Sequence, residues 1–320
     1  MRSSFQLLLG SVLLFGPVHC TGTRPPERVE DIPLVTTDVA RFWAAYPAAL
    51  RDTAQAYRVF QEHYFNNGSP GLQDYFTRKY KGDAHLFARR VIQRPRYYAS
   101  ARQTMLSVAD QKPQIVAAFR RLQQLYPPVR FNPIYFLVGG FAGSTAQPVG
   151  LLIGVDQDAN GPGVDTSELS LVQRNRCGPV TNMPALLTHE MIHNTQQPHD
   201  GTLLSGAIRE GMADFVAELV MGLPGTNARL HVYGNAHERA LWHAFKQEMF
   251  GHNPQNWLAN SKQETPDKPC DLGYYVGYKI CQAYYEKAPD KKQAVAEMLT
   301  TRDFKAFLTQ SGYEEQMSAP

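Results

Sequence analysis

The sequence predicts an α+β fold, in which a small sheet is flanked by a helical N-terminal layer and a helical C-terminal layer. Apolar residues recur at intervals of three and four from Asp38 to Tyr126 and again after Cys177, as in amphipathic helices. Between these regions, short apolar runs bounded by Gly and Pro indicate strands. Hydrophobic residues make up 43% and charged residues 19% of the 320 residues, an ordinary globular balance that excludes wholesale disorder.

The first 20 residues predict export. A charged start at Arg2 precedes an apolar run over residues 5–15, as in a secretory signal, and this run is too short to span a membrane. Cys20 leaves two alternatives open: a lipoprotein signal whose cysteine is acylated, or ordinary cleavage after Cys20. His19 is larger than the residue that a lipoprotein signal peptidase usually accepts. The expected location is the periplasm, the cell envelope or the extracellular space, with membrane contact only through a lipid anchor at Cys20.

The remaining chain reads as a linker and one domain. Residues 21–36 are polar and rich in Pro, typical of a linker or an extended lead-in. Residues 37–320 form the single predicted domain, with a helical part over 37–127 and a second part over 128–320. Within the helical part, four prolines are expected to divide the region into several helices: Pro47, Pro70, Pro95 and Pro113.

The second part begins with the predicted strands. They cover residues 132–140 and 148–156, and the intervening "GGFAGS" is expected to be a hairpin or sheet connection, because no helix follows it as a phosphate loop requires. Helices are expected after Cys177, with shorter pieces following, at 183–197, 205–222, 235–250 and 273–288.

Charge and cysteine content exclude some classes of function. The net charge is only +3. The arginines between Arg78 and Arg102 are explained by the solvent-exposed faces of helices, so we expect no nucleic-acid partner. No CxxC spacing indicates a cysteine metal site. In an exported chain the preferred disulfide is Cys177 with Cys270, and Cys281 reads as a small buried hydrophobe.

The stretch "THEMIHNTQQ" predicts a metal site on a helix. His189 and His193 are four residues apart, so both imidazoles lie on one face and can bind one cation. Glu190 is rotated by about 100° round the helix, where it borders the metal without capping it. The alternative is that two histidines merely share a helix face.

A second helix supplies the missing ligand. In "AIREGMADFVAELVMG", Glu210 and Asp214 are also four residues apart. If a short loop connects the two helices so that they run antiparallel, Glu210 lies beside His193 and can be the third ligand. Asp214 can then accept a hydrogen bond from one of the ligand histidines and orient its ring. Three protein ligands around one Zn²⁺ leave a fourth position for water, which is the catalytic pattern.

These residues resemble the gluzincin branch of zinc metallopeptidases. More closely, "FLVGGFAGSTAQPVGLLIGVD", "LLTHEMIHNTQQ", "REGMADFVAEL" and "GYYVGYKICQAYYEK" are similar to a bacterial family of predicted zinc-dependent proteases catalogued as a domain of unknown function. The similarity covers roughly residues 130 to 313. It implies a zincin-like fold and an exported peptidase acting on a peptide or protein substrate.

The expected mechanism follows from that site. Glu190 acts as general base on zinc-bound water, and Tyr274, Tyr278 or His231 donates to the transition state. The strand over 150–156 pairs with an extended substrate. Two rival functions stay open: a non-catalytic cell-envelope binding or scaffold module with a structural or vestigial zinc site, and a zinc amidase acting on cell-wall peptides. The sequence does not indicate the oligomeric state.

Overall fold

The structure is a computed structural model that describes residues 26, 28–222 and 227–318. The signal segment predicted over residues 1–20, Cys20 included, lies outside the described residues. Within the expected lead-in over 21–36, the described residues begin to pack at a 3-10 turn, η1 (Val29–Asp31), and at the first strand, β1 (Leu34–Val35). In the part of the chain that is described, no helix combines the length and the apolar character needed to cross a membrane.

The sheet has four strands in the order β1-β2-β4-β3, with β2 (Ile134–Leu137), β3 (Thr145–Gln147) and β4 (Gly150–Gly154). β2 runs parallel to both β1 and β4, whereas β3 is antiparallel to β4. Every residue of β2 and β4 is buried, which explains their continuous apolar sequence. "GGFAGS" is therefore a sheet connection, and the hairpin lies between β3 and β4.

One strand prediction is wrong. Residues 150–156 were expected to offer a free edge to an extended peptide, but β4 is paired on both sides. A strand whose N–H and C=O groups are already used in two ladders has none to offer to a further strand. The edge position next to β4 is occupied by β3, a segment of three residues.

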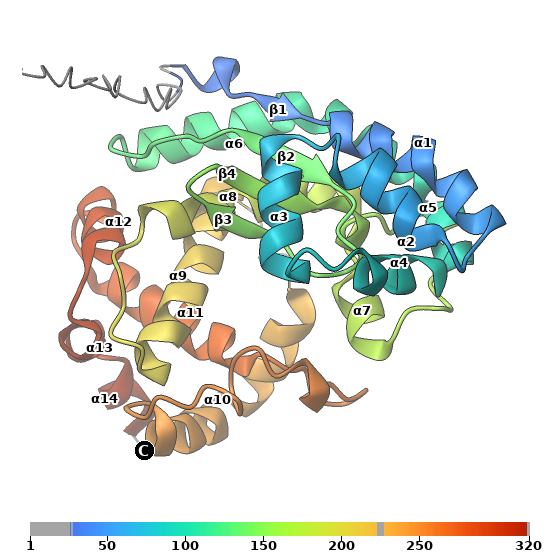
Figure 1. Cartoon of the computed structure of the whole chain (residues 1–320). Helices are drawn as coiled ribbons and strands as arrows, with labels where there is room; N and C mark the ends of the chain where they lie inside the picture. Colours follow the sequence, from blue (N-terminus) through green and yellow to red (C-terminus); the bar gives the residue numbers. More distant parts are fainter. Residues whose placement is uncertain (1–25, 27, 223–226, 319–320) are drawn as a thin grey trace, which may run out of the picture.

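The N-terminal layer consists of short helices that cover the sheet (Figure 1). Pro70, Pro95 and Pro113 stand in the first turns of their helices, where a missing N–H costs nothing. Pro47 lies inside α1 instead, directly after the buried Tyr46, whose ring contacts that of Trp43 with centroids 5.2 Å apart. The elements of this layer are α1 (Thr37–Arg51), α2 (Ala56–Phe60), the π-helix η2 (Gln61–Phe65), α3 (Pro70–Tyr80), α4 (Ala84–Ile92), α5 (Pro95–Leu106), η3 (Ser107–Gln111) and α6 (Lys112–Leu125).

Aromatic side chains fill the core of this layer. Phe42, Phe60 and Phe87 are fully buried. The ring centroids of Phe42 and Phe60 are 5.6 Å apart, and those of Phe60 and Phe87 are 5.1 Å apart with the planes at 88°. Offset and edge-to-face contacts of this kind add to the stability that burial alone provides.

The C-terminal layer is helical, as expected, and the coarse α+β prediction is confirmed. The predicted helices agree with α8, α9 and α11 to within two residues at each end, whereas α10 begins seven residues before the expected position 235 and has a kink at His237. Two short elements after β4 lie beside the N-terminal helices, η4 (Val155–Gln157) against α5 and α7 (Leu171–Arg176) next to α4 in Figure 1. The elements of the C-terminal layer are η5 (Val180–Asn182), α8 (Met183–Thr195), α9 (Leu203–Met221), α10 (Ala228–Glu248), η6 (Ser261–Gln263), α11 (Leu272–Lys287), α12 (Lys291–Thr300), α13 (Phe304–Ser311) and α14 (Tyr313–Ser318).

Two glycines bring α9 and α11 into backbone contact. A Cβ added at Gly211 would lie 2.0 Å from the backbone nitrogen of Tyr278, and a Cβ at Gly277 would lie 1.8 Å from the carbonyl oxygen of Ala207. No side chain fits between these helices, so only glycine allows the approach. α9 also packs against α8, and Figure 1 shows α9 and α11 crossing in the lower half of the molecule, below the sheet. These contacts position the candidate site.

Candidate metal centre

α8 presents its two histidines on one face. The helix begins after Asn182 with Pro184 in its first turn, as the sequence predicts, although the Asn182 side chain makes no capping hydrogen bond. Met183, Leu187, Met191 and Ile192 are fully buried and fix the rotation of the helix in the core. His189 and His193 consequently lie together on the side that faces α9.

α9 returns beside α8 in the opposite direction. It begins at Thr202, whose hydroxyl accepts a hydrogen bond from the backbone N–H of Ser205 at 3.2 Å. His193 lies next to Glu210, and His189, one turn earlier in α8, lies next to Asp214, one turn later in α9. This pairing is that of antiparallel helices, the arrangement that the sequence predicts.

Three ligand-type atoms converge at this level. His189 Nε2 and His193 Nε2 are 3.1 Å apart. Glu210 Oε2 lies 3.7 Å from His189 Nε2 and 3.2 Å from His193 Nε2. Bonds of ~2.0–2.1 Å in a tetrahedral zinc site place ligand atoms about 3.3 Å from one another. The spacing of the three atoms therefore fits a small divalent ion bound between them.

Each imidazole is held by its other nitrogen. His189 Nδ1 is 2.8 Å from Asp214 Oδ1, and His193 Nδ1 is 2.9 Å from Gln196 Oε1. Gln196 is fixed in turn, since its side-chain N–H donates to the carbonyl of Arg209 at 2.7 Å. Acceptors at both Nδ1 atoms favour the Nδ1–H tautomer and leave both Nε2 lone pairs for a cation. The sequence reasoning found Asp214 and missed Gln196.

The electrostatics of the cluster are strongly coupled. Burial lowers the pKa of His189, but the Asp214 and Glu210 carboxylates outweigh it and raise this pKa well above the ordinary value. Burial raises the pKa of Glu210, but the hydrogen bonds from His189 and His193 outweigh it and lower this pKa well below the ordinary value. A half-buried carboxylate kept ionised beside two imidazoles is the donor set of a divalent transition metal ion.

Glu190 lies beside the cluster and does not belong to it. Its side chain is buried at 9% exposure. Burial raises its pKa, and the neighbouring His189 and His193 act in the opposite direction. Among the described residues, the group that can hold a metal consists of His189, His193 and Glu210, and Glu190 is outside it.

Of the three predicted transition-state donors, one lies at the cluster. The Tyr274 ring is nearly parallel to that of His189, with centroids 6.3 Å apart, and burial followed by the nearby Glu210 raises the pKa of Tyr274 well above the ordinary value. Tyr278, one turn further along α11, packs against Phe215 at 5.3 Å and against His231 at 4.5 Å. Tyr278 and His231 therefore belong to the α9–α10–α11 packing.

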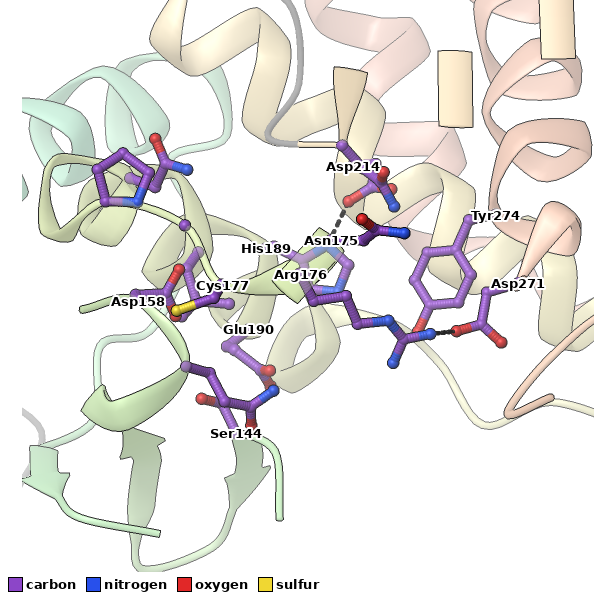
Figure 2. Close-up of a pocket in the computed structure, with 16 residues that line it drawn as sticks. Ser144, Asp158, Asn175, Arg176, Cys177, His189, Glu190, Asp214, Asp271 and Tyr274 are labelled. Atoms are coloured by element: carbon purple, nitrogen blue, oxygen red, sulfur yellow. Dashed lines mark hydrogen bonds and ion pairs between the residues drawn. The ribbon is translucent and has the colours of Figure 1, made fainter. Parts of the chain in front are cut away.

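The cluster borders a cavity of about 420 Å³. His189, Glu190, Asp214 and Tyr274 line it on one side, and the segment from Asn175 to Pro179 lines it on another. Figure 2 shows His189 joined to Asp214, with the Tyr274 ring nearby and Arg176 directed toward Asp271. His199 and Asp200 are exposed in the loop after α8.

The preferred disulfide is wrong. Cys177, Cys270 and Cys281 are all free and buried. Cys177 Sγ lies 3.3 Å from the Tyr97 hydroxyl, whereas Cys270 Sγ lies 3.0 Å from the guanidinium of Arg176. The two loops that looked similar in sequence thus hold their cysteines against different partners. Cys281 is fully buried, as predicted.

Comparison with known proteins corrects the functional prediction. The family model described as gliding motility protein GldB, a lipoprotein family, matches residues 23–315. The identification as a gluzincin-type zinc metallopeptidase is therefore wrong, and with it the prediction of an enzyme that hydrolyses peptide bonds with Glu190 as general base. The physical reason is that HExxH and ExxxD specify ligand positions on two helices, while a reaction depends on the whole site.

The same finding supports the predicted location. A lipoprotein family is exported, and the protein is a cell-envelope protein, in agreement with the N-terminal sequence. No curated protein and no solved structure matches the chain significantly. The family match nevertheless extends over nearly the whole sequence, from the end of the signal segment into α14. The chain therefore belongs to the family of the gliding motility protein GldB.

Proposed function

We propose that the protein is a non-catalytic module of the cell envelope that serves gliding motility, and that its α8–α9 cluster binds one divalent metal ion. The family supplies the first half of this proposal. The second half is carried by a single observation: the ligand atoms of His189, His193 and Glu210 all lie within 4.8 Å of one another. Two imidazoles and one carboxylate suit Zn²⁺ best among the common ions.

The ion would act as a structural brace. It would tie the C-terminal turns of α8 to the N-terminal half of α9, across the loop over residues 196–202. A cation between the imidazoles and Glu210 also compensates the partial desolvation of this half-buried carboxylate. Binding to the folded state alone stabilises it by RT ln(1 + [L]/Kd), about 2.7 kcal/mol at a hundredfold excess over Kd.

Metal analysis tests the brace. We expect purified protein to retain about one zinc ion per chain and to show a higher Tm with zinc than after chelation. His193→Ala and Glu210→Gln should lose the ion, because each removes a ligand. Asp214→Asn should bind about 10–100-fold more weakly, because it loosens the hold on His189. Metal content by mass spectrometry and competition with a chromophoric chelator measure these effects.

Glu190→Gln is the matched control. It changes a buried carboxylate on the same helix, outside the ligand group, and should bind zinc as the wild type does. Equal zinc content in the wild type and in His193→Ala would contradict the metal site. Zinc-loaded protein should also leave a mixed peptide library intact; cleavage that Glu190→Gln abolishes would contradict the non-catalytic assignment.

Three finer proposals accompany this one. Cys20 carries the lipid anchor, which the lipoprotein family and the preceding apolar run support. The described residues form one domain rather than two, which the single hydrophobic core supports. The arrangement of the sheet beside α8 and α9 supports a zincin-like fold, which stays a prediction.

A further inference from the structure

A second cavity lies on the other side of Gln157 and Arg176. Its volume is about 340 Å³, and it is lined by residues of α4 and α7, the loop after β2 and the turn η6. Three arginines line it, and among its described lining residues there is no Asp or Glu: Arg90, Arg94, Gly140, Phe141, Gln157, Ser170, Val172, Gln173, Arg176 and Ser261. The charged side chains of its described lining are therefore all cationic.

Two of the three arginines are not neutralised by the protein. Arg90 lies over the ring of Tyr80 at 5.4 Å, and Arg94 lies over the ring of Phe141 at 5.6 Å. Arg94 also donates to the carbonyl of Arg90 and to Gln173 Oε1. Over the described residues, neither arginine forms an ion pair with a carboxylate. Arg176 differs, because it is paired with Asp271.

Polar atoms beside the cavity lack partners. Arg94 Nε and Gln157 Oε1 are buried, and neither makes a hydrogen bond within the described protein. An unsatisfied buried donor or acceptor destabilises the fold unless a ligand or water completes it. The donor belongs to Arg94 in the cavity wall, and the acceptor belongs to Gln157, which lines both cavities.

We propose that this second cavity binds a phosphate group. Two uncompensated guanidinium groups match the charge of about −1.5 to −2 that a phosphate monoester carries at neutral pH. Guanidinium forks bind phosphate oxygens through pairs of parallel N–H bonds, and Arg94 Nε is a free donor of this type. The aromatic rings under Arg90 and Arg94 hold the two side chains in place for such contacts.

The phosphate site does not depend on the metal. None of its residues belongs to the His189, His193 and Glu210 group. The two cavities nevertheless share Gln157 and Arg176, so the body of a larger phosphorylated ligand can extend toward the metal side. Binding measured on Glu210→Gln protein separates the two proposals, because this variant lacks the metal ligand and keeps every arginine.

Calorimetric titration with inorganic phosphate and diphosphate tests the site. We expect saturable binding at low ionic strength that falls steeply with added salt. Arg94→Gln and Arg90→Gln should each weaken it at least tenfold without changing the Tm by more than a few degrees. Arg89→Gln is the matched control, since Arg89 is exposed on the same helix as Arg90 and does not line the cavity.

The outcomes distinguish the source of the phosphate. Binding of free phosphate without binding to vesicles of phosphatidic acid indicates a soluble ligand. Binding to these vesicles, lost in Arg94→Gln and absent with phosphatidylcholine, indicates a lipid headgroup. No saturation up to tens of millimolar with any of these probes, or equal affinity in the wild type, Arg90→Gln and Arg94→Gln, would overturn the proposal.

Discussion

At the scale of residues, the half-buried carboxyl group of Asp158 affects stability through its titration. It lies in the wall of the metal-side cavity, and burial, followed by the negative charge of the nearby Asp156, raises the pKa of Asp158 to about 7. A folded-state pKa above the ordinary value means that the folded protein binds more protons than the unfolded chain. Its contribution to stability is thus present at pH 4 and is lost as the pH rises through about 7.

Asp158→Asn should remove this dependence. The amide stays neutral, so we expect the variant to have a Tm several degrees above that of the wild type at pH 8 and about the same Tm at pH 4.5. Thermal unfolding followed by circular dichroism over this pH range measures the difference. Asp165→Asn, on an exposed loop, is the control. A constant gap between Asp158→Asn and wild type at every pH would count against the assigned pKa.

Some residues of the candidate site could be predicted and others could not. His189, His193, Glu210 and Asp214 follow from the spacing of four residues on two helices, because helix geometry fixes which side chains share a face. Gln196 fell within the helix expected over 183–197, but it is the C-terminal cap of α8, where the backbone leaves helical geometry. Whether Tyr274 or Tyr278 lies at the metal cluster depends on how α11 packs against α8 and α9. A local sequence pattern does not contain this information.

At the scale of elements, the glycine contact between α9 and α11 positions Glu210. Gly211 follows Glu210 directly, so the backbone approach at Gly277 also sets how far the carboxylate extends toward α8. In the sequence, Gly211 and Gly277 are simply glycines within predicted helices, where glycine lowers the helix propensity. Their packing role appears once both helices are placed together.

Gly277→Ala should separate these helices. A Cβ at 1.8 Å from a backbone oxygen cannot be accommodated by a side-chain shift, so we expect a loss of about 1–3 kcal/mol or more. This corresponds to a fall in Tm of roughly 2–4 °C per kcal/mol for a domain of this size. Gly161→Ala is the control, because the nearest atom to an added Cβ there is 3.9 Å away. Equal effects in both variants would show that the close contact is unimportant.

The strands show the limit of element-level prediction. Both main strands were located from their apolar runs, because buried strands have that composition. The sequence did not predict that these strands pair in parallel or that β3 forms the edge of the sheet. The segment "GGFAGS" is compatible with a hairpin between neighbouring strands and with a connection to a strand further along the sheet. The buried Asp156 settles the geometry: its carboxylate accepts N–H bonds from Gly139 and Phe141, both at 2.8 Å. The loop after β2 is thereby held against the end of β4.

At the scale of the whole molecule, the functional class came from the family and not from the motif. The three ligand-type residues and the supporting Asp214 follow from short sequence patterns. Such patterns also occur in proteins of different activity. The family match uses the pattern of almost the entire chain, including the N-terminal helices that carry no ligand of the metal cluster. Export was predictable because a signal segment is a local feature of composition.

Cys20→Ser tests the anchor at this scale. Wild-type protein expressed with its own signal should sediment with membranes and carry an acylated N-terminal peptide, which mass spectrometry detects. The variant should be released, because it lacks the thiol that carries the acyl chains. Release of the wild type and the variant to the same extent would argue for ordinary cleavage after Cys20. His199→Ala, an exposed loop change, serves as control for expression.

The early burial of Val29 limits the length of the tether. Val29 is 3% exposed, and the adjacent Glu30 accepts a hydrogen bond from Arg120 on α6 at 2.7 Å. Eight residues lie between Cys20 and this fixed point, so the chain takes nine residue steps, and at most ~3.3–3.6 Å per step they reach about 30 Å. That is less than the diameter of a domain of this size, about 50 Å. If Cys20 is acylated, as proposed, this tether keeps the β1–α6 side within that distance of the bilayer and limits how far the protein can reorient.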